Sequence, residues 1–335
     1  MKRLLNTLYI TYGNRYLSLD GENVVVMEDK KEIGRIPLHN LQAIVTFGYT
    51  GASPALMGAC AQRNIELSFM SGNGRFLARV SGEEKGNVTL RKTQYRISEK
   101  KEESVKIAKN FILGKVYNAR WVLERAARDY SMRLDAELLK KKSAFLGQSM
   151  NKIRECEDAG TLLGLEGEAA SVYFSAFDEL ILQQKEDFYF HGRNKRPPLD
   201  NVNAMLSFGY SLLAGMCGGA LEAVGLDPYV GFFHTDRPGR MSLALDLMEE
   251  FRSVMVDRFV LTLINKRIMK PEYFLTKENG AVIMTEEGRK AFLSAWQGKK
   301  TGDDYASIFR RKDRVGNGSI CTEHAAGTFP ARGSG

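Results

Sequence analysis

The chain is poor in cysteine and histidine, with four of each among its 335 residues. The cysteines, Cys60, Cys156, Cys217 and Cys321, are far apart and form no Cys-x-x-Cys pair. Such spacing argues against a zinc ribbon and against the disulfide framework of a small secreted protein. The pattern fits a protein of the reducing cytosol.

The sequence also lacks a long hydrophobic run near its start. The first five residues, MKRLL, resemble the beginning of a signal peptide, but Asn6 and Thr7 interrupt the apolar stretch. No later segment suggests a membrane span. We therefore expect a cytoplasmic protein without a membrane partner.

The composition is that of a globular, basic protein, with 44% hydrophobic and 26% charged residues. Its length exceeds the usual size of one hydrophobic core, which favours two domains. The net charge of +8 and the isoelectric point near 9.2 favour an acidic partner such as nucleic acid. Many basic proteins bind no polyanion, so charge is compatible with DNA binding without requiring it.

The first 85 residues have the pattern of a β-rich domain. Short apolar or alternating runs, separated by turn residues, occur at 16–19, 24–26, 41–47, 65–69 and 76–80. One helix interrupts them, predicted over 54–63 with Ser53 as its N-cap and Pro54 at its first position.

After a predicted linker at 86–98, the periodicity of the sequence becomes helical. Helices are predicted at 99–129, 133–155, 159–184, 201–224 and 241–266, followed by a hairpin at Gly280 and a last helix to Trp296. The fold class is therefore α+β, with an α-helical bundle over 99–297. Residues 298–335 lose periodicity and are rich in glycine and arginine, so we expect a disordered tail.

The first long helix contains a single glycine, Gly114, and basic residues along its length after the first turn. The basic residues are Lys106, Lys109, Lys115, Arg120, Arg125 and Arg128. A solvated helix face explains them more simply than DNA binding does.

Glu166 is a carboxylate in an apolar environment. At 100° per residue it shares a stripe with Leu162, Ala169 and Tyr173, whereas Glu168 lies away from that stripe. An ionised carboxylate on an apolar face needs a partner, which can be an arginine of the bundle or a metal ion. The pattern leaves both alternatives open.

A second helix, after Pro238, carries polar residues at helical spacing. Ser242, Asp246, Glu249 and Ser253 form one stripe, which taken alone most resembles the wet face of an amphipathic helix. His234 lies in the loop just before this helix. One imidazole with carboxylates from two helices is a donor set suited to Mg²⁺ or Mn²⁺.

The segment 191–200 is a basic loop, HGRNKRPPLD, which contains two consecutive prolines. It can hold phosphate groups, or it can be an exposed connection that ends in Asp200 as a helix cap. The sequence favours neither.

Several long motifs in series resemble the Cas1 family, the CRISPR-associated endonucleases and integrases of spacer acquisition. They are GLEGEAA from Gly164, RNKRPPLDNVNAMLS from Arg193 and DPYVGFFHTDRPGRMSLALDLMEEFR from Asp227. The resemblance covers about residues 1–297, and it is strongest to the branch of subtype I-C systems.

The resemblance implies a homodimer that assembles with the small Cas2 protein and inserts foreign DNA into a CRISPR array. It implies a catalytic Mg²⁺ or Mn²⁺ held by Glu166, His234 and Glu249, with Asp246 as an outer or alternate ligand. Together with charge and location, it makes five basic residues candidates for DNA phosphate contacts. They are Arg193, Lys195, Arg196, Arg237 and Arg240.

Family members continue into an ordered, apolar C-terminal segment, whereas this chain changes texture at Gly298. We hypothesise a frameshifted or altered C-terminus; the same reading frame in independent isolates would count against it. Two alternatives to the integrase remain, a general metal-dependent nuclease and a DNA-binding scaffold without catalysis.

Overall fold

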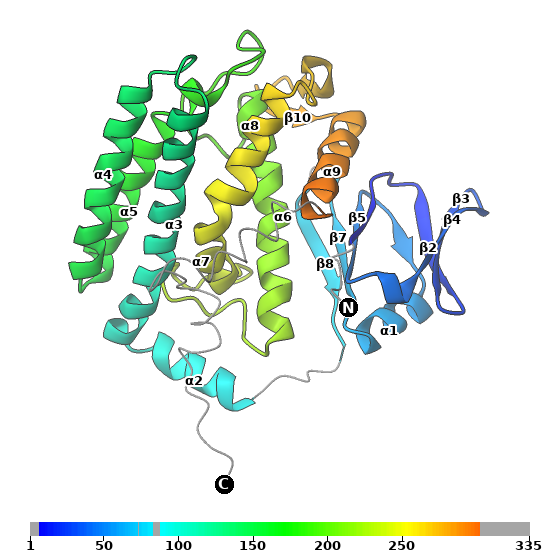
Figure 1. Ribbon diagram of the computed structural model, residues 1–335. Helices are drawn as coiled ribbons and strands as arrows, with labels where there is room; N and C mark the ends of the chain where they lie inside the picture. Colours follow the sequence, from blue (N-terminus) through cyan, green and yellow to red (C-terminus); the bar gives the residue numbers. More distant parts are fainter. Residues whose placement is uncertain (1–6, 73, 83–87, 302–335) are drawn as a thin grey trace. The chain divides into compact units, whose positions relative to one another are not determined.

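The computed structural model describes residues 7–72, 74–82 and 88–301 (Figure 1). These residues form two compact units. One unit contains residues 7–82 together with 268–301, and the other contains residues 88–267. The fold is α+β, with the sheets in the first unit and a helical bundle in the second.

The first sheet of the mixed unit has the strand order β4-β3-β2-β6. Its strands are β2 (Arg15–Asp20), β3 (Asn23–Glu28), β4 (Lys31–Pro37) and β6 (Gly51–Ala52). Neighbours are antiparallel except β2 and β6, which are parallel. The predicted strands at 16–19 and 24–26 are confirmed as β2 and β3, joined at Gly21, whose φ of 56° suits a tight turn.

The second sheet has the order β1-β5-β7-β8. Its strands are β1 (Thr7–Ile10), β5 (Ala43–Phe47), β7 (Glu66–Met70) and β8 (Phe76–Val80). The predicted helix is confirmed as α1 (Pro54–Gln62), and the hydroxyl of Ser53 accepts a hydrogen bond from the Leu56 amide at 3.2 Å. A short 3₁₀ turn, η1 (Leu38–Asn40), precedes β5.

Residues 268–301 pack with this mixed unit, although the sequence had suggested that they continue the helical domain to 297. They form η4 (Pro271–Tyr273), the hairpin β9 (Phe274–Thr276) and β10 (Val282–Met284), and α9 (Glu286–Thr301). The Gln297 side chain donates to the Thr7 carbonyl at 3.0 Å. Since α9 continues to Thr301, the predicted tail cannot begin at 298; residues 302–335 lie outside the described residues.

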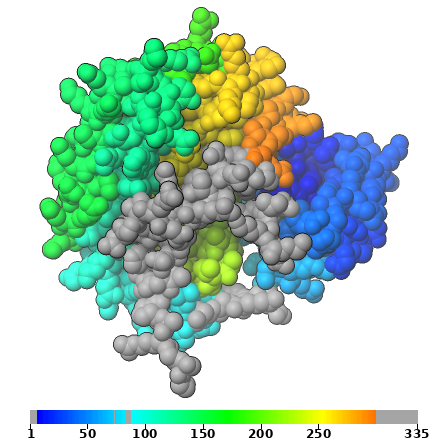
Figure 2. Space-filling model, viewed as in Figure 1, coloured from blue at the N-terminus to red at the C-terminus, as the bar shows by residue number. Residues whose placement is uncertain are grey.

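The helical unit begins with α2 (Val88–Ser98), where the sequence had suggested a linker. The other helices are α3 (Lys101–Asp129), α4 (Ala136–Glu155), α5 (Ala159–Phe174), α6 (Asn201–Ala223), α7 (Ser242–Phe251) and α8 (Arg258–Asn265). Helix α3 packs against α4, α5 and α7. In Figure 2 the side chains of α3 and α4 form a continuous surface on the face shown.

Two predicted helices of this unit are interrupted. Helix α5 ends at Phe174 instead of 184, and a short 3₁₀ turn, η2 (Asp178–Leu180), follows it. The predicted helix at 241–266 is divided by a π-helical segment, η3 (Arg252–Asp257), between α7 and α8. Such wider turns are rare and often occur at functional sites.

Helix α6 is long and apolar enough to cross a membrane, contrary to the expectation that no segment would be. However, 61% of its most apolar window is buried inside the protein. A central helix of a globular bundle has the same composition, because it is surrounded by other helices.

Gly114 has a packing role in the helical unit. A Cβ added there would lie 2.8 Å from Cγ of Glu250, so α3 and α7 approach each other closely at this point. The Asn118 side chain donates to the Glu250 carbonyl oxygen at 2.8 Å, one turn further along α3. The close approach of the two helices at Gly114, the only glycine of α3, therefore places Lys115 beside Glu249.

Candidate metal centre

The polar stripe of α7 is buried. Ser242 and Asp246 are 0% exposed, and Glu249 and Ser253 are 3% exposed. The wet-face interpretation of this stripe is therefore wrong. Buried carboxylates require charged or hydrogen-bonding partners, and the structure supplies them from the loop before α7 and from α3.

Asp246 organises the loop that carries His234. Its Oδ2 accepts the backbone amides of Phe232 and Phe233 at 2.7 and 2.9 Å. Its Oδ1 accepts the His234 amide at 2.8 Å and lies 2.7 Å from His234 Nδ1. Because an ionised carboxylate only accepts hydrogen bonds, Nδ1 is the donor in this contact, and in the neutral imidazole Nε2 then keeps its lone pair. Nε2 lies 4.0 Å from Oε1 of Glu249.

Gly231 allows this loop to close around Asp246. A Cβ at Gly231 would lie 2.7 Å from the Ser242 side chain, 2.9 Å from the His234 carbonyl oxygen and 3.0 Å from Oδ2 of Asp246. Contacts below 3.0 Å require the neighbours to move, so a larger residue would displace the histidine or its carboxylate.

Glu166 and Glu249 are brought together through Lys115. The ammonium nitrogen of Lys115 forms an ion pair with Oε1 of Glu166, and it lies 2.7 Å from Oε2 of Glu249. The Lys115 and Glu166 side chains are 15% and 17% exposed, and that of Glu249 is 4% exposed. Helices α3, α5 and α7 thus each contribute one charged group to the same point.

Arg252 adds a second cation, because its Nη2 lies 3.2 Å from Oε1 of Glu249. Burial by itself would raise the pKa of Glu249, but the positive charges of Arg252 and Lys115 outweigh it and lower that pKa to about 2. Glu249 is therefore a carboxylate at neutral pH, in the form that binds a cation.

The donor set fits a hard divalent cation, since it offers two carboxylates and one imidazole nitrogen. Among the described residues, no three His, Cys, Asp or Glu side chains are already arranged as metal ligands. Between Glu166 and Glu249 the structure has the ammonium of Lys115. The site therefore attracts positive charge.

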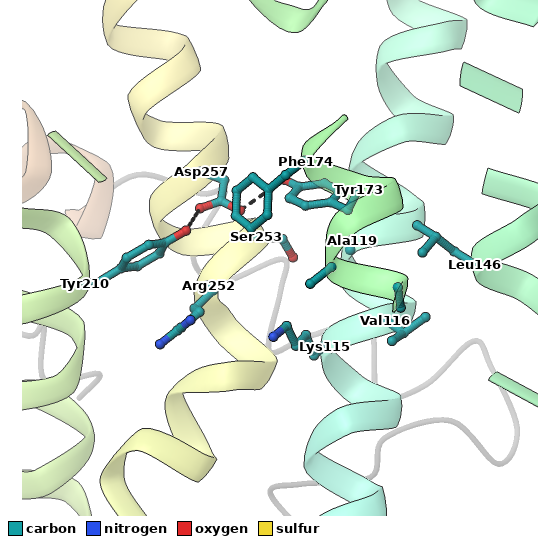
Figure 3. Close-up of a pocket in the computed structure, with 12 residues that line it drawn as sticks. Lys115, Val116, Ala119, Leu146, Tyr173, Phe174, Tyr210, Arg252, Ser253 and Asp257 are labelled. Carbon is teal, nitrogen blue, oxygen red and sulfur yellow. Dashed lines mark hydrogen bonds between the residues drawn. The ribbon is translucent and has the colours of Figure 1, made fainter. Parts of the chain in front are cut away.

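A buried network lies on the next turns of the same helix. Asp257 is 1% exposed and accepts hydrogen bonds from the hydroxyls of Tyr173, at 3.0 Å, and Tyr210, at 2.5 Å (Figure 3). The guanidinium of Arg252 lies 4.9 Å from the centre of the Tyr210 ring. The network therefore supports the arginine that contacts Glu249.

Asp257 is expected to make stability depend on pH. Burial raises its pKa from 3.8 to about 6. Between these values the folded chain keeps a proton that the unfolded chain releases, so the free energy of unfolding should fall as pH rises from 4 to 6. The decrease should be roughly 2–3 kcal/mol, and D257N should remove it. Urea unfolding of both proteins across this range measures the difference; parallel curves would contradict the assignment.

The Arg193 side chain contacts residues of α6 in the helical unit. Its guanidinium donates to Oδ1 of Asn203 at 2.6 Å and to the Ser207 hydroxyl at 3.0 Å, and it lies 5.3 Å from the centre of the Tyr210 ring. Asp200 caps α6 by accepting the Asn203 amide at 2.6 Å. These contacts fix the basic loop, so Arg193 positions its neighbours.

The other candidate DNA contacts are more accessible. Lys195, Arg196 and Arg237 are exposed, and Arg240 is half-buried. Burial, and then the charges of Arg252 and Arg193, lower the pKa of Lys195, while the charge of Glu249 opposes this. Lys195 is thus close enough to Glu249 for the two charges to interact.

The sequence interpretation missed three contributors to this site, namely Lys115, Arg252 and Asp257. Lys115 had been grouped with the solvated basic residues of its helix. It lies three residues after Ile112 and four before Ala119, both buried, so the apolar periodicity of α3 was a usable signal. No comparable signal marked Asp257, whose partners come from two other helices.

The chain is similar to known proteins over most of its length. Residues 8–298 match the family model described as CRISPR associated protein Cas1. A Rhodospirillum rubrum protein named CRISPR-associated endonuclease Cas1 2 is 51% identical over 304 residues, covering 90% of this chain and 88% of that protein.

Two solved structures share the fold. A Cas1 protein from Thermotoga maritima has a TM-score of 0.73 at 24% identity, covering 87% of this chain and 88% of its own. A casposase bound to an integration product has a TM-score of 0.74 at 26% identity, covering 88% of this chain and 82% of its own.

Proposed function

Because the chain belongs to the Cas1 family of CRISPR-associated proteins, we propose that Glu166, His234 and Glu249 bind a divalent metal at which the protein cuts and joins DNA. The observation that carries this proposal is the orientation of His234. Its Nδ1 is held by Asp246 at 2.7 Å, so Nε2 is available on the side of Glu249. Asp246 acts as the positioning residue and Glu249 as the ligand.

The reaction is attack of a DNA 3′-hydroxyl on a phosphodiester, which inserts a DNA fragment as a new spacer. A bound Mg²⁺ or Mn²⁺ supplies acidification of the attacking hydroxyl and neutralisation of charge on the phosphate. Asp246 keeps His234 in the tautomer that can bind the metal. Arg252 holds Glu249 in place through a 3.2 Å contact.

DNA is the substrate, and the protein acts as a homodimer with Cas2 in the cytoplasm. The casposase of similar fold is bound to an integration product, which supports DNA as the partner. The net charge of +8 supports the same partner.

A half-site integration assay with Mg²⁺ or Mn²⁺ tests the proposed function. The full chain, with Cas2, should join a labelled DNA fragment to a CRISPR repeat, and EDTA should abolish joining. Cutting without joining would indicate a general nuclease. DNA binding without either reaction would indicate a scaffold.

Loss of the exposed cations should weaken DNA binding in a salt-dependent way. K195A and R237A should each lower affinity about uniformly across sequences and reduce the slope of log K against log salt by about 1. Fluorescence anisotropy between 50 and 200 mM salt, a range in which phosphate contacts weaken strongly, measures both quantities. Lys140, exposed on α4, gives the control K140A; an equal effect there would remove the specific assignment.

A further inference from the structure

Lys115 lies between two of the proposed metal ligands. Its ammonium pairs with Glu166 and lies 2.7 Å from Glu249, and its side chain is 15% exposed. Two half-buried or buried carboxylates at one point repel each other and are poorly solvated. Lys115 places one positive charge against both of them, and Arg252 adds a second positive charge at Glu249.

A metal ion and this ammonium cannot use the same carboxylate oxygens together. Mg²⁺ binds oxygen at about 2.0–2.1 Å, and it carries a charge of the same sign as Lys115. A metal bound to both Glu166 and Glu249 therefore requires the ammonium to leave its present position.

The structure offers a place beside the site for the displaced side chain. A cavity of about 30 Å³ is lined by Lys115, Ser253 and Asp257, among other residues (Figure 3). The Ser253 hydroxyl oxygen is buried and has no hydrogen-bond partner among the described residues. A lysine has a flexible four-carbon stem, and Lys115 and Ser253 line the same cavity, so this hydroxyl is a candidate acceptor for the displaced ammonium.

We propose that Lys115 is a built-in counter-ion, which replaces the metal in the metal-free protein and is displaced when the metal binds. This inference rests on the metal site of the proposed function. It assigns to Lys115 a role separate from DNA binding. Lys115 stabilises the helical unit before metal arrives, and the same contact lowers the apparent metal affinity.

Two opposite effects follow for K115M, which keeps the unbranched shape and most of the length of the side chain and removes its charge. The metal-free protein should unfold roughly 5–10 °C lower, because Glu166 loses its ion-pair partner and Glu249 keeps only Arg252. Its apparent dissociation constant for Mn²⁺ should become at least about tenfold smaller, because no ammonium group competes with the metal for the carboxylates.

The experiment uses the full-length protein without DNA. Thermal unfolding is measured in EDTA and at saturating Mn²⁺, and Mn²⁺ binding is followed by the electron paramagnetic resonance of the free ion. H234A defines the binding that does not involve this site. K109M is the matched control, since Lys109 of the same helix donates to the Arg154 carbonyl oxygen at 3.1 Å.

The outcomes separate the two proposals. If wild type and H234A bind Mn²⁺ equally, the metal site itself is wrong. If wild type shows the site but K115M binds no more tightly, or melts in EDTA like wild type and K109M, the counter-ion role is wrong. If K115M does not fold, K115M/E166Q should fold, because one of the two uncovered charges is gone; a double variant as unstable as K115M would also overturn the role.

Discussion

Replacing Glu166 by glutamine is expected to lower the rate of strand transfer by about 1000-fold or more. The amide keeps the shape of the side chain and removes the negative charge that a metal requires. Glu166 is the contribution of α5 to the centre, through its ion pair with Lys115. A half-site integration assay at saturating Mn²⁺ measures the rate.

The control is E168Q, because Glu168 lies on the same helix two residues later and is exposed. It should retain strand transfer within about twofold of wild type, as expected for a surface substitution. Full strand transfer by E166Q, with unchanged thermal stability, would exclude Glu166 as a ligand.

Replacing Asp246 by asparagine is expected to reduce strand transfer by about 100-fold or more. Asp246 accepts three backbone amides and faces His234 Nδ1 at 2.7 Å. The amide nitrogen of asparagine is itself a donor, so it repels the N–H groups that Asp246 accepts. It can also donate to His234 Nδ1, which favours the tautomer with a protonated Nε2. That tautomer cannot bind a metal, so the dissociation constant for Mn²⁺ should rise by about 10–100-fold.

The matched control is D236N in the same loop. Asp236 is exposed and accepts one backbone amide, that of Gly231, at 3.1 Å. It should alter strand transfer only slightly, because its carboxylate makes no contact with the histidine. A D246N protein that melts like wild type yet binds Mn²⁺ with unchanged affinity would contradict the positioning role of Asp246.

Local patterns of the β-rich part predicted β2, β3, β5, β7, β8 and α1, but they missed β1, β4 and β6. Alternation and turn residues were enough for strands such as β2 and β3, and Ser53 with Pro54 was enough for the start of α1. The membership of 268–301 was not predictable, because it depends on long-range contacts such as that of Gln297 with Thr7. Periodicity reports a helix but does not report its partner.

Helix α2 shows the same limit. Its sequence is mostly polar, and its anchor is Gln94, which is 0% exposed. The Gln94 side chain donates to the carbonyl oxygens of Asp227 and Val230 at 2.8 and 2.9 Å and accepts the Asp227 amide at 2.9 Å. A glutamine with three partners 133 to 136 residues away gives no local sign of burial.

Within the site, contacts between residues that are close in the sequence were the easiest to predict. Asp246 and His234 lie twelve residues apart and contact each other directly. Glu166 was found because a carboxylate on an apolar stripe needs a partner, but the partner in the structure is Lys115 of α3. The charge of Lys115 predicts a position on the solvated face of α3. The close packing of α3 and α7 at Gly114 explains why the side chain lies in the interior of the bundle.

The π-helical segment η3 gives the chain an intolerance of small changes in length. It follows directly on the helix that carries Glu249, and it holds both Arg252 and Asp257. An insertion or deletion within it would change which side chains occupy the wide turn, because the hydrogen-bond spacing along η3 differs from that of the flanking α-helical turns. Arg252 and Asp257 could then no longer face Glu249 and the tyrosines at once, so this stretch should accept substitutions far more readily than insertions or deletions.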